Sequence, residues 1–291
     1  MNLFAQSEAS LDITGGTVSV RQITEYPWSG EVEIIVTPDE PREFSVHVRI
    51  PGWAQGDPVP GDLYAYRNGS ADKARLVVNG TAVTLDELNS GYAVVTRTWN
   101  RGDVIKLSLP MPVRVVESHP EVEANRGRIA IERGPIVYCM EGVDAGGYVR
   151  NIWLPESIEL TPMHEPQLLG GITALRGTAN AQVQHDPEGD VLTEKRPIQL
   201  IPYYAWDHRA ACEMAVWLPT SAELVEVVPP PTIASRATAR ASHCFQMDTV
   251  DAINDQLEPA NSIDHSIPRH TFWPRKGTTE WLQLDPAQPA T

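Results

Sequence analysis

Cysteine is scarce in this chain of 291 residues, which contains only Cys139, Cys212 and Cys244. The three are far apart, odd in number and free of any CxxC spacing, which argues against a disulfide framework and a zinc ribbon. We therefore expect buried thiols.

Long apolar runs are also missing, since no window approaches the roughly 20 residues of a membrane helix. The N-terminus lacks the basic and apolar regions of a signal peptide, so no membrane partner and, by default, a cytoplasmic location are expected.

Basic residues are outnumbered, with 23 Lys and Arg against 38 Asp and Glu and a formal net charge of −15. Such a surface repels the phosphate backbone, so nucleic acid is not an expected partner. The sequence also contains no GxSxG elbow, Walker loop, HExxH pair or dinucleotide-binding fingerprint. None of these common signatures of catalysis is available to define an active site.

Proline and glycine are abundant instead, at 25 and 20 residues, and they leave little room for long helices. In EFSVHVRI, Phe44, Val46 and Val48 alternate with polar residues, as a half-buried strand requires. Between two apolar runs, Asn79-Gly80 supplies the strongest short-range signal of a hairpin. Short strands at even spacing predict an all-β fold of antiparallel sandwiches.

The pattern divides the chain into two consecutive β-sandwich domains of jelly-roll type and a shorter C-terminal part. We place the first sandwich at residues 1–120 and the second at residues 121–227, because the polar segment around Pro120 interrupts the strand pattern. Three consecutive prolines then form a stiff linker that opens the part at residues 228–291. The only plausible helical piece is a turn or two in TVDAIND, residues 249–255.

One candidate metal site consists of His119, Glu121 and Glu123, which would share one face of a strand. An imidazole and two carboxylates could bind a divalent cation or perform acid–base chemistry. A solvated polar strand gives the same spacing, and this is the commoner origin of such clusters. We therefore assign no metal site.

A second candidate is the pair Glu132 and Glu141, which brackets RGPIVYC. Glycoside hydrolysis commonly uses two carboxylates, roughly 5 to 10 Å apart. Since Glu132 stands beside Arg133, a structural ion pair is favoured and no catalytic residue is assigned. An enzyme acting through Glu132 or Glu141 is therefore the weakest of the three functional hypotheses for this chain, and the other two follow from the residues described below.

Aromatic residues form two further candidates, in YYAWDHR and in HTFWPRK. Aromatic faces can stack on sugar rings, so the candidate carbohydrate-binding residues are Tyr204, Trp206, Trp273 and Arg275. The alternation of the first segment instead favours packing of Tyr203 and its neighbours in a core, where aromatic side chains contribute most.

Five segments, in order, resemble a known family: VRIPGWA, LVVNG, GYAVVTRTWNRGDVIKLSLPMPVRVV, RGPIVYCMEGVD and IPYYAWDHRAACEMAVWLP. They are similar to the region that follows the catalytic domain in glycoside hydrolase family 127, the β-L-arabinofuranosidase-like enzymes. The resemblance extends from Met1 to Pro219. It implies two sandwiches that buttress a catalytic (α/α)6 barrel and contribute to dimer contacts.

In that family the barrel carries a zinc ion held by cysteines and a glutamate, a cysteine nucleophile and a glutamate acid/base. This chain has no adjacent Cys-Cys pair and no helical-barrel sequence. The resemblance therefore implies no cofactor here, with zinc expected only in the barrel. The implied partners are that barrel, a second copy of the chain and arabinose-containing glycans.

Residues 237–285 are similar to the opening half of a galactose-binding-like, discoidin-type sandwich, with Trp281, Gln283 and Asp285 matching its Trp-x-Gln-x-Asp strand. Only PAQPAT follows, so we expect an unfinished domain with Trp281 in its core. At the other end, MNLFAQSEASL resembles the strand that leaves the barrel, and Met1 is expected to be an internal start or a truncation.

The leading hypothesis is therefore a non-catalytic β-sandwich part of a family-127-like enzyme that supports the barrel and its oligomer contacts. The alternative is a stand-alone carbohydrate-binding module.

Overall fold

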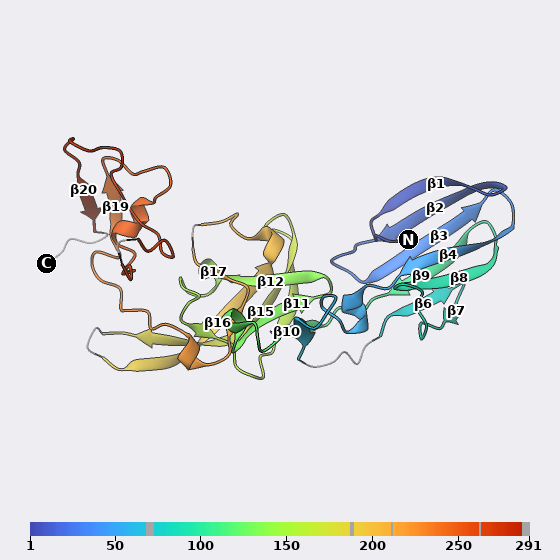
Figure 1. The fold of residues 1–291 in the computed structure, drawn as a ribbon, viewed down its shortest axis with the longest axis horizontal. Helices are drawn as coiled ribbons and strands as arrows, with labels where there is room; N and C mark the ends of the chain where they lie inside the picture. The colour runs from blue at the N-terminus through green and yellow to red at the C-terminus, as the bar shows by residue number, and fades with distance from the viewer. Residues whose placement is uncertain (68–72, 187–188, 211, 262, 287–291) are drawn as a thin grey trace. The chain divides into compact units, whose positions relative to one another are not determined.

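A computed structural model describes residues 1–67, 73–186, 189–210, 212–261 and 263–286 (Figure 1). These residues form β-strands and short 3-10 turns with no α-helix, which confirms the all-β prediction. No helix among them is long and apolar enough to cross a membrane. The chain divides into two compact units, one formed by Met1–Ala181 with Glu194–Glu226 and the other by Gln182–Thr193 with Val227–Thr291.

The first sandwich of the first unit has two antiparallel layers (Figure 1). The smaller layer pairs β4 (Arg42–Arg49) with β8 (Tyr92–Trp99). The larger layer has six strands in the order β1 (Ser7–Ile13), β2 (Gly16–Thr24), β3 (Glu31–Pro38), β9 (Asp103–Ser108), β6 (Arg75–Val78) and β7 (Thr81–Val83).

The core of this sandwich follows the sequence alternation. Val48 is fully buried, whereas the side chains of the odd-numbered residues of β4 are exposed. Phe44 stacks on Trp99 with ring centroids 5.9 Å apart, and Trp99 Nε1 donates to the carbonyl oxygen of Phe44 at 3.0 Å. The hairpin between β6 and β7 is also confirmed, since Asn79 and Gly80 have φ angles of 48° and 83°.

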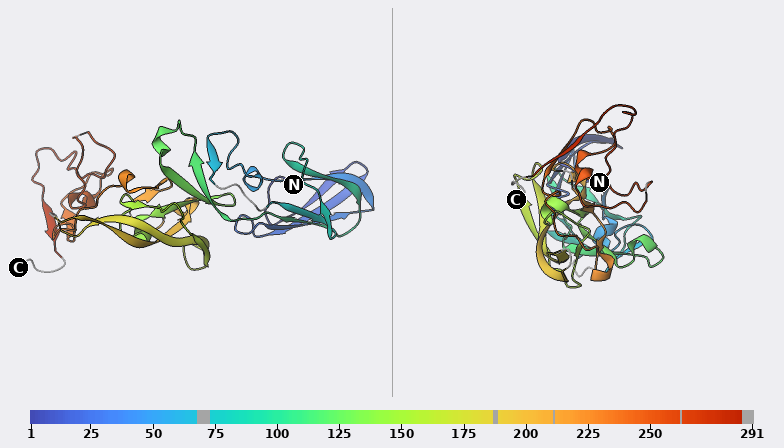
Figure 2. Two further views of the ribbon diagram at one scale, coloured as in Figure 1. Left: turned by 90° about the horizontal axis from the view of Figure 1, so that it is seen from below. Right: turned by 90° about the vertical axis from the view of Figure 1, so that its left-hand side faces the viewer.

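A ten-stranded antiparallel sheet makes up most of the rest of the first unit, and the outer ends of two of its strands belong to the second unit. Its main path runs β13 (Ile152–Trp153), β15 (Ile172–Gln184), β16 (Val191–Pro202), β12 (Ile136–Glu141), β11 (Arg128–Arg133), β10 (Val113–Ser118) and β5 (Tyr64–Tyr66). Off this path, β14 (Thr161–Glu165) pairs with β15, β17 (Met214–Ala215) with β12, and β18 (Leu218–Pro219) with β11. The turned views show β15 and β16 as the long yellow hairpin (Figure 2).

Large side chains fill the interior beneath this sheet, and Ile131, Tyr138, Leu200 and Ile201 have no solvent-exposed surface. Tyr138 also donates its hydroxyl to the carbonyl oxygen of Thr173 at 3.0 Å. This bond gives the buried phenol a partner, as a core tyrosine requires.

The three cysteines have three different environments, so the expectation of buried thiols is correct for only one of them. Cys139 lies in the core of the first unit, whereas Cys212 is exposed and Cys244 is half-buried. Cys139 belongs to β12, but Cys212 and Cys244 lie in loops, where no facing layer covers them.

The second unit contains the antiparallel pair β19 (Thr238–Ala241) and β20 (Leu282–Asp285) and the 3-10 turn η6 (Val250–Ile253). The turn confirms the helical piece predicted in TVDAIND. Trp281 is 51% exposed, so the expectation of a core residue is wrong. Among the described residues of this unit no further strand faces the pair, and such a pair buries little side-chain surface, which explains the exposure.

Candidate functional site

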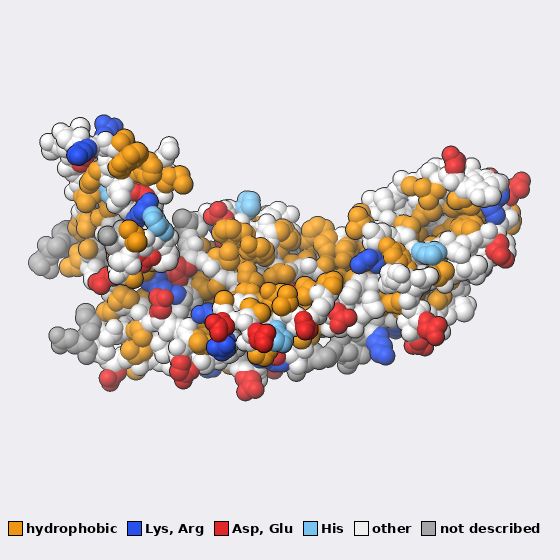
Figure 3. Space-filling view, viewed as in Figure 1, with side chains coloured by type: hydrophobic (Ala, Val, Ile, Leu, Met, Phe, Trp, Pro, Cys, Tyr) orange, Lys and Arg blue, Asp and Glu red, His pale blue; other side chains and the backbone are white. Residues whose placement is uncertain are grey.

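Four large aromatic side chains lie at the surface of the first unit and form what we call the aromatic surface. They are Trp28, Tyr203, Tyr204 and Trp206, which are 45%, 43%, 55% and 39% exposed. Figure 3 shows hydrophobic side chains gathered on the face that carries β12. The expected burial of Tyr203 is wrong, because β16 ends at Pro202 and the chain enters the 3-10 turn η4 (Tyr203–Ala205). The turn breaks the two-residue alternation on which that expectation rested.

Contacts within the aromatic surface fix the orientation of its rings. The rings of Tyr203 and Trp206 are parallel within 1°, with centroids 6.2 Å apart. Trp28 Nε1 donates to the Tyr204 hydroxyl at 3.2 Å, and an Arg133 Nη donates to the carbonyl oxygen of Trp28 at 3.2 Å. The surface therefore joins the first sandwich to the ten-stranded sheet.

A mostly apolar groove of about 460 Å³ adjoins the aromatic surface. Tyr203 and Tyr204 form one part of its wall. The remaining lining comes from the β2–β3 connection and from β12 with the residue before it, namely Tyr26, Pro27, Pro135, Ile136 and Val137. Aromatic and aliphatic walls with few polar groups favour an apolar occupant over a strongly hydrated one.

Buried charges hold the loop that displays these rings. Glu141 is 2% exposed, and its Oε1 accepts from the main-chain N–H of Asp207 at 3.0 Å. Arg209 donates from Nε to Glu141 Oε2 at 3.1 Å and from an Nη to Asp144 Oδ1 at 2.9 Å. The hydrogen bonds to Asp144, then those to Glu141, raise the pKa of Arg209 above its ordinary value. These bonds anchor Asp207 and Arg209, which directly follow Trp206, to the core, so the neighbouring aromatic side chains are pre-organised.

Glu132, the other candidate carboxylate, has a different partner from the one expected. Its Oε2 accepts from the Tyr66 hydroxyl at 2.9 Å, and the guanidinium of Arg114 lies 4.7 Å from the centroid of the Tyr66 ring. Burial raises the pKa of Glu132, against the opposing effects of the Tyr66 hydrogen bond and the Arg114 charge. The predicted ion pair with Arg133 is wrong, because adjacent residues of a strand point to opposite faces.

The segment His119–Glu123 is a turn, so the expectation that its three side chains share a strand face is also wrong. Val122 donates its N–H to the carbonyl oxygen of His119 at 2.9 Å, and Glu121 donates its N–H to the His119 ring at 3.3 Å. Pro120 has no N–H for a β-ladder, which ends β10 here. Within the described residues, no group of three or more His, Cys, Asp or Glu side chains could hold a metal ion.

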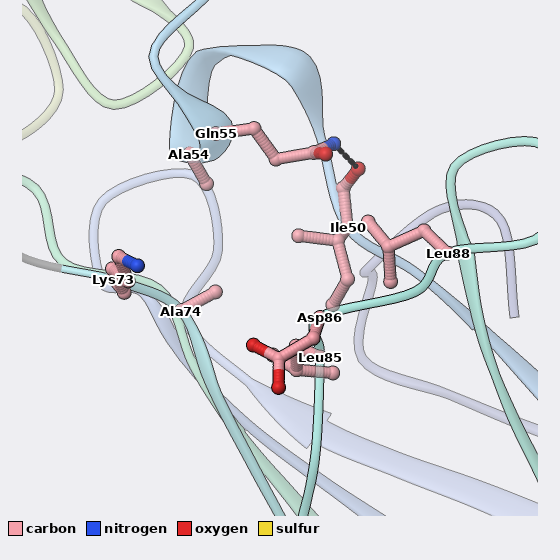
Figure 4. A pocket seen from close by; sticks show the side chains of 8 residues that line it. All are labelled: Ile50, Ala54, Gln55, Lys73, Ala74, Leu85, Asp86 and Leu88. Atoms are coloured by element: carbon pink, nitrogen blue, oxygen red, sulfur yellow. Dashed lines mark hydrogen bonds between the residues drawn. The ribbon is translucent and has the colours of Figure 1, made fainter.

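The first sandwich contains a pocket of about 330 Å³ that sequence reasoning missed (Figure 4). Gln55, in the 3-10 turn η1 (Gly52–Gln55), donates from Nε2 to the carbonyl oxygen of Ile50 at 2.7 Å. The apolar lining is Ile50, Ala54, Ala74, Leu85 and Leu88, with Lys73 and Asp86 as its charged members. These residues come from separate segments of the chain, so no local motif reveals the pocket. Its charged groups are exposed and define no specific ligand.

The remaining candidates, Trp273 and Arg275, lie in one turn of the second unit, where Arg275 donates its N–H to the carbonyl oxygen of Phe272 at 2.6 Å. Trp273 is 66% exposed and makes an edge contact with Phe245, with centroids 5.3 Å apart. Tyr204 and Trp206 belong to the first unit. The four carbohydrate-binding candidates thus form two pairs on different units.

Family models match most of the first unit. Residues 1–111 match the middle domain of glycoside hydrolase family 127, described as β-L-arabinofuranosidase, and residues 113–219 match the C-terminal domain of the same family. The chain belongs to glycoside hydrolase family 127. It is 30% identical over 216 residues to a non-reducing end β-L-arabinofuranosidase of Bifidobacterium longum subsp. longum, covering 69% of this chain and 30% of the relative.

Solved structures show the same relationship. A GH127 β-arabinofuranosidase aligns with a TM-score of 0.72 and 37% identity over 77% of this chain and 34% of its own. A GH127 β-L-arabinofuranosidase from Geobacillus stearothermophilus T6 aligns with a TM-score of 0.64 and 36% identity over 75% of this chain and 33% of its own. The chain therefore spans about a third of the length of these relatives.

Proposed function

We propose that this chain is the non-catalytic β-sandwich part of a β-L-arabinofuranosidase-type enzyme and that it supports the catalytic barrel and its oligomer contacts. The main support is that the chain matches the middle domain and then the C-terminal domain of the family, in that order. Under this proposal, zinc and the reacting groups belong to the barrel. The sandwiches contribute packing surface and stability.

The aromatic surface and its groove are the part of the first unit best suited to this role. Exposed apolar patches rimmed by polar residues commonly mark protein interaction sites. Tyrosine and tryptophan are enriched at the centres of interfaces. Because Arg209 and Glu141 hold the loop in place, docking a barrel here would cost little conformational entropy.

A hybrid enzyme tests the proposal. Residues 1–219 replace the matched region of the Bifidobacterium longum relative, and hydrolysis of an aryl β-L-arabinofuranoside is measured with zinc and a thiol present. The hybrid should hydrolyse the substrate, whereas this chain alone should not. Zinc-dependent hydrolysis by the chain alone would contradict the proposal.

Point variants of the hybrid test the docking face. Trp28→Ala with Tyr204→Ala should lower the thermal midpoint of the hybrid more than that of the isolated chain. Leu63→Ala is the matched control, because Leu63 is 54% exposed and lies outside the aromatic surface. Equal losses in the hybrid and the isolated chain would mean that the aromatic residues serve only the local fold. Light scattering of the wild-type hybrid would measure the oligomer contacts.

A second candidate function is binding of arabinose-containing glycans, favoured by the parallel, exposed rings of Tyr203 and Trp206. Calorimetry with arabino-oligosaccharides tests it. Saturable heat that disappears in Trp206→Ala or Trp273→Ala would support a binding module, and the absence of heat would exclude one at the concentrations used.

A further inference from the structure

The smaller layer of the first sandwich has an open edge. Among the strands that the structure describes, β4 pairs only with β8. The main-chain N–H of Ile50 donates to the carbonyl oxygen of Gly91 at 2.9 Å, so the even-numbered residues of β4 direct their main-chain groups to β8. The N–H and C=O groups of Glu43, Ser45 and His47 therefore point to the opposite side. A strand edge whose main-chain groups point away from its one neighbouring strand is a template for another strand.

Met1 already lies on this edge as a strand residue would. Its amino group donates to the carbonyl oxygen of His47, and Arg49 donates its N–H to the carbonyl oxygen of Met1 at 3.0 Å. These two hydrogen bonds join Met1 to the residues before and after Val48. A residue of a parallel strand opposite Val48 would make the same two bonds. The side chain of Met1 also packs against the core, on the same side as Val48.

The larger layer opposite has a matching uncovered position. Leu11 on β1 pairs with Val18 on β2, so the two side chains lie on one face of the sheet. Val18 is 1% exposed in the core, but Leu11 is 48% exposed on that same face. The six-stranded layer thus faces a layer of only two strands, and no strand that the structure describes covers the core side of β1.

We infer that the free edge of β4 is an acceptor site for an extended polypeptide strand that runs parallel to β4 and leads into Met1. This inference rests on the proposed function, because the occupant is the segment that precedes the middle domain in a family-127 protein. The strand would lie beside Arg42–His47. Its apolar side chains would alternate toward the core to cover Leu11, and its polar side chains would face solvent.

A second copy of the chain fits this edge less well. Two identical edges related by a two-fold axis pair antiparallel, because such an interface uses the same patch on both partners. Met1 occupies the Val48 end of the edge in the parallel direction. The geometry therefore favours a different segment, entering from the Arg42 end.

An N-terminal extension tests the site. We would fuse about six residues, Val-Thr-Val-Thr-Val-Thr, directly before Met1, which matches a common strand length. The second and fourth added residues before Met1 would then carry valine toward the core, as Met1 does. The control extension has the same composition in the opposite alternation, Thr-Val-Thr-Val-Thr-Val, and directs valine to solvent. A second control places proline at the second residue before Met1, where an N–H is needed.

Amide hydrogen exchange is the primary measurement. The first extension should slow exchange at Glu43, Ser45 and His47 by about tenfold or more, and both controls should leave these amides fast. The inference would be overturned if the Val-Thr and Thr-Val extensions slowed exchange at these amides equally, or if neither extension slowed it. Slow exchange at these amides in the unextended chain would also overturn the inference. This holds whether the protection is independent of protein concentration or rises with it, as self-association requires.

Leu11→Ala provides an independent readout. In the unextended chain the substitution should change the thermal midpoint little, because the side chain is half-exposed. With the Val-Thr extension it should remove most of the gain in midpoint that the extension gives, and a double-mutant cycle measures this coupling. Neither readout involves a barrel. An inactive hybrid enzyme would therefore contradict the supporting function and leave the acceptor edge standing.

Discussion

Arg209 donates from Nε to Oε2 of Glu141 at 3.1 Å, although Glu141 is 2% exposed and lies at the end of a central strand. A carboxylate at such depth is stable only with a charged or hydrogen-bonding partner. The pair anchors the segment that directly follows Tyr204 and Trp206. Glu141 is therefore assigned to the architecture of the aromatic surface and not to acid–base chemistry.

Removing the arginine should destabilise the first unit strongly. Arg209→Ala leaves Glu141 buried without its cation, and breaking one side of a buried pair typically costs about 3–5 kcal/mol of unfolding free energy. Urea unfolding at neutral pH measures this loss. Arg126→Ala is the matched control, because Arg126 and Glu123 form an exposed ion pair at 3.6 Å and such pairs contribute about 0–1 kcal/mol. Similar losses in the two variants would contradict a buried role for Arg209.

Glu132 should make the stability depend on pH in the opposite direction to an ordinary ion pair. Burial raises its pKa in the folded state, so its contribution to stability is complete below the unfolded value of about 4.3 and is lost as the pH rises through the folded value. Glu132→Gln should therefore gain stability relative to wild type as the pH increases above about 4.3, measured by urea unfolding from acid to neutral pH.

Tyr66→Phe provides the control for this pH dependence. The Tyr66 hydroxyl donates to Glu132 and so favours the charged carboxylate. Without this donor the pKa of Glu132 should rise further and the transition should move to higher pH. A constant difference between Glu132→Gln and wild type at every pH would show that the carboxyl does not titrate differently on folding.

The sequence predicted the parts of the fold in which local pattern determines structure. Alternation identified β4, and Asn79-Gly80 identified the hairpin between β6 and β7, because both signals lie within a few residues. The same rule failed at Tyr203, where the strand ends at Pro202 and a 3-10 turn begins. Periodicity shows which side chains would share a face, but it does not show where the strand stops.

The candidate site was predictable only in part. Tyr204 and Trp206 stand out as an aromatic cluster in the sequence, but Trp28 is 176 residues from Tyr204 and no local signal links them. The buried partners Arg209 and Asp144 were missed for the same reason. The open edge of β4 depends on which strands pair, a property of the three-dimensional arrangement that one strand's own sequence does not contain.

The three thiols should differ in reactivity. Burial, and then the charge of Glu141, raises the pKa of Cys139 to about 12, and the thiolate is the reactive form. Cys212 is exposed, so a disulfide reagent at mildly alkaline pH should modify it first in the native protein. Cys139 should react only after unfolding. Cys212→Ser should remove the fast phase of the reaction with the reagent. The assignment would be contradicted if the fast phase persisted in this variant and disappeared in Cys139→Ser.

Asp264 should titrate well below an ordinary aspartate. The Ser266 hydroxyl and N–H donate to its Oδ1 at 2.5 and 2.8 Å, and the N–H of Ala260 donates to its Oδ2 at 3.0 Å. Together these bonds lower its pKa to about 2, with the Ser266 side chain the largest cause. Because the folded pKa is depressed, the stabilisation is present above the unfolded value of about 3.9 and is lost as the pH falls toward 2. An NMR titration of the Asp264 carboxyl should give a midpoint near the folded value, and Ser266→Ala should raise that midpoint. An ordinary midpoint in the wild-type chain, unchanged by Ser266→Ala, would mean that the turn does not hold the carboxylate in solution.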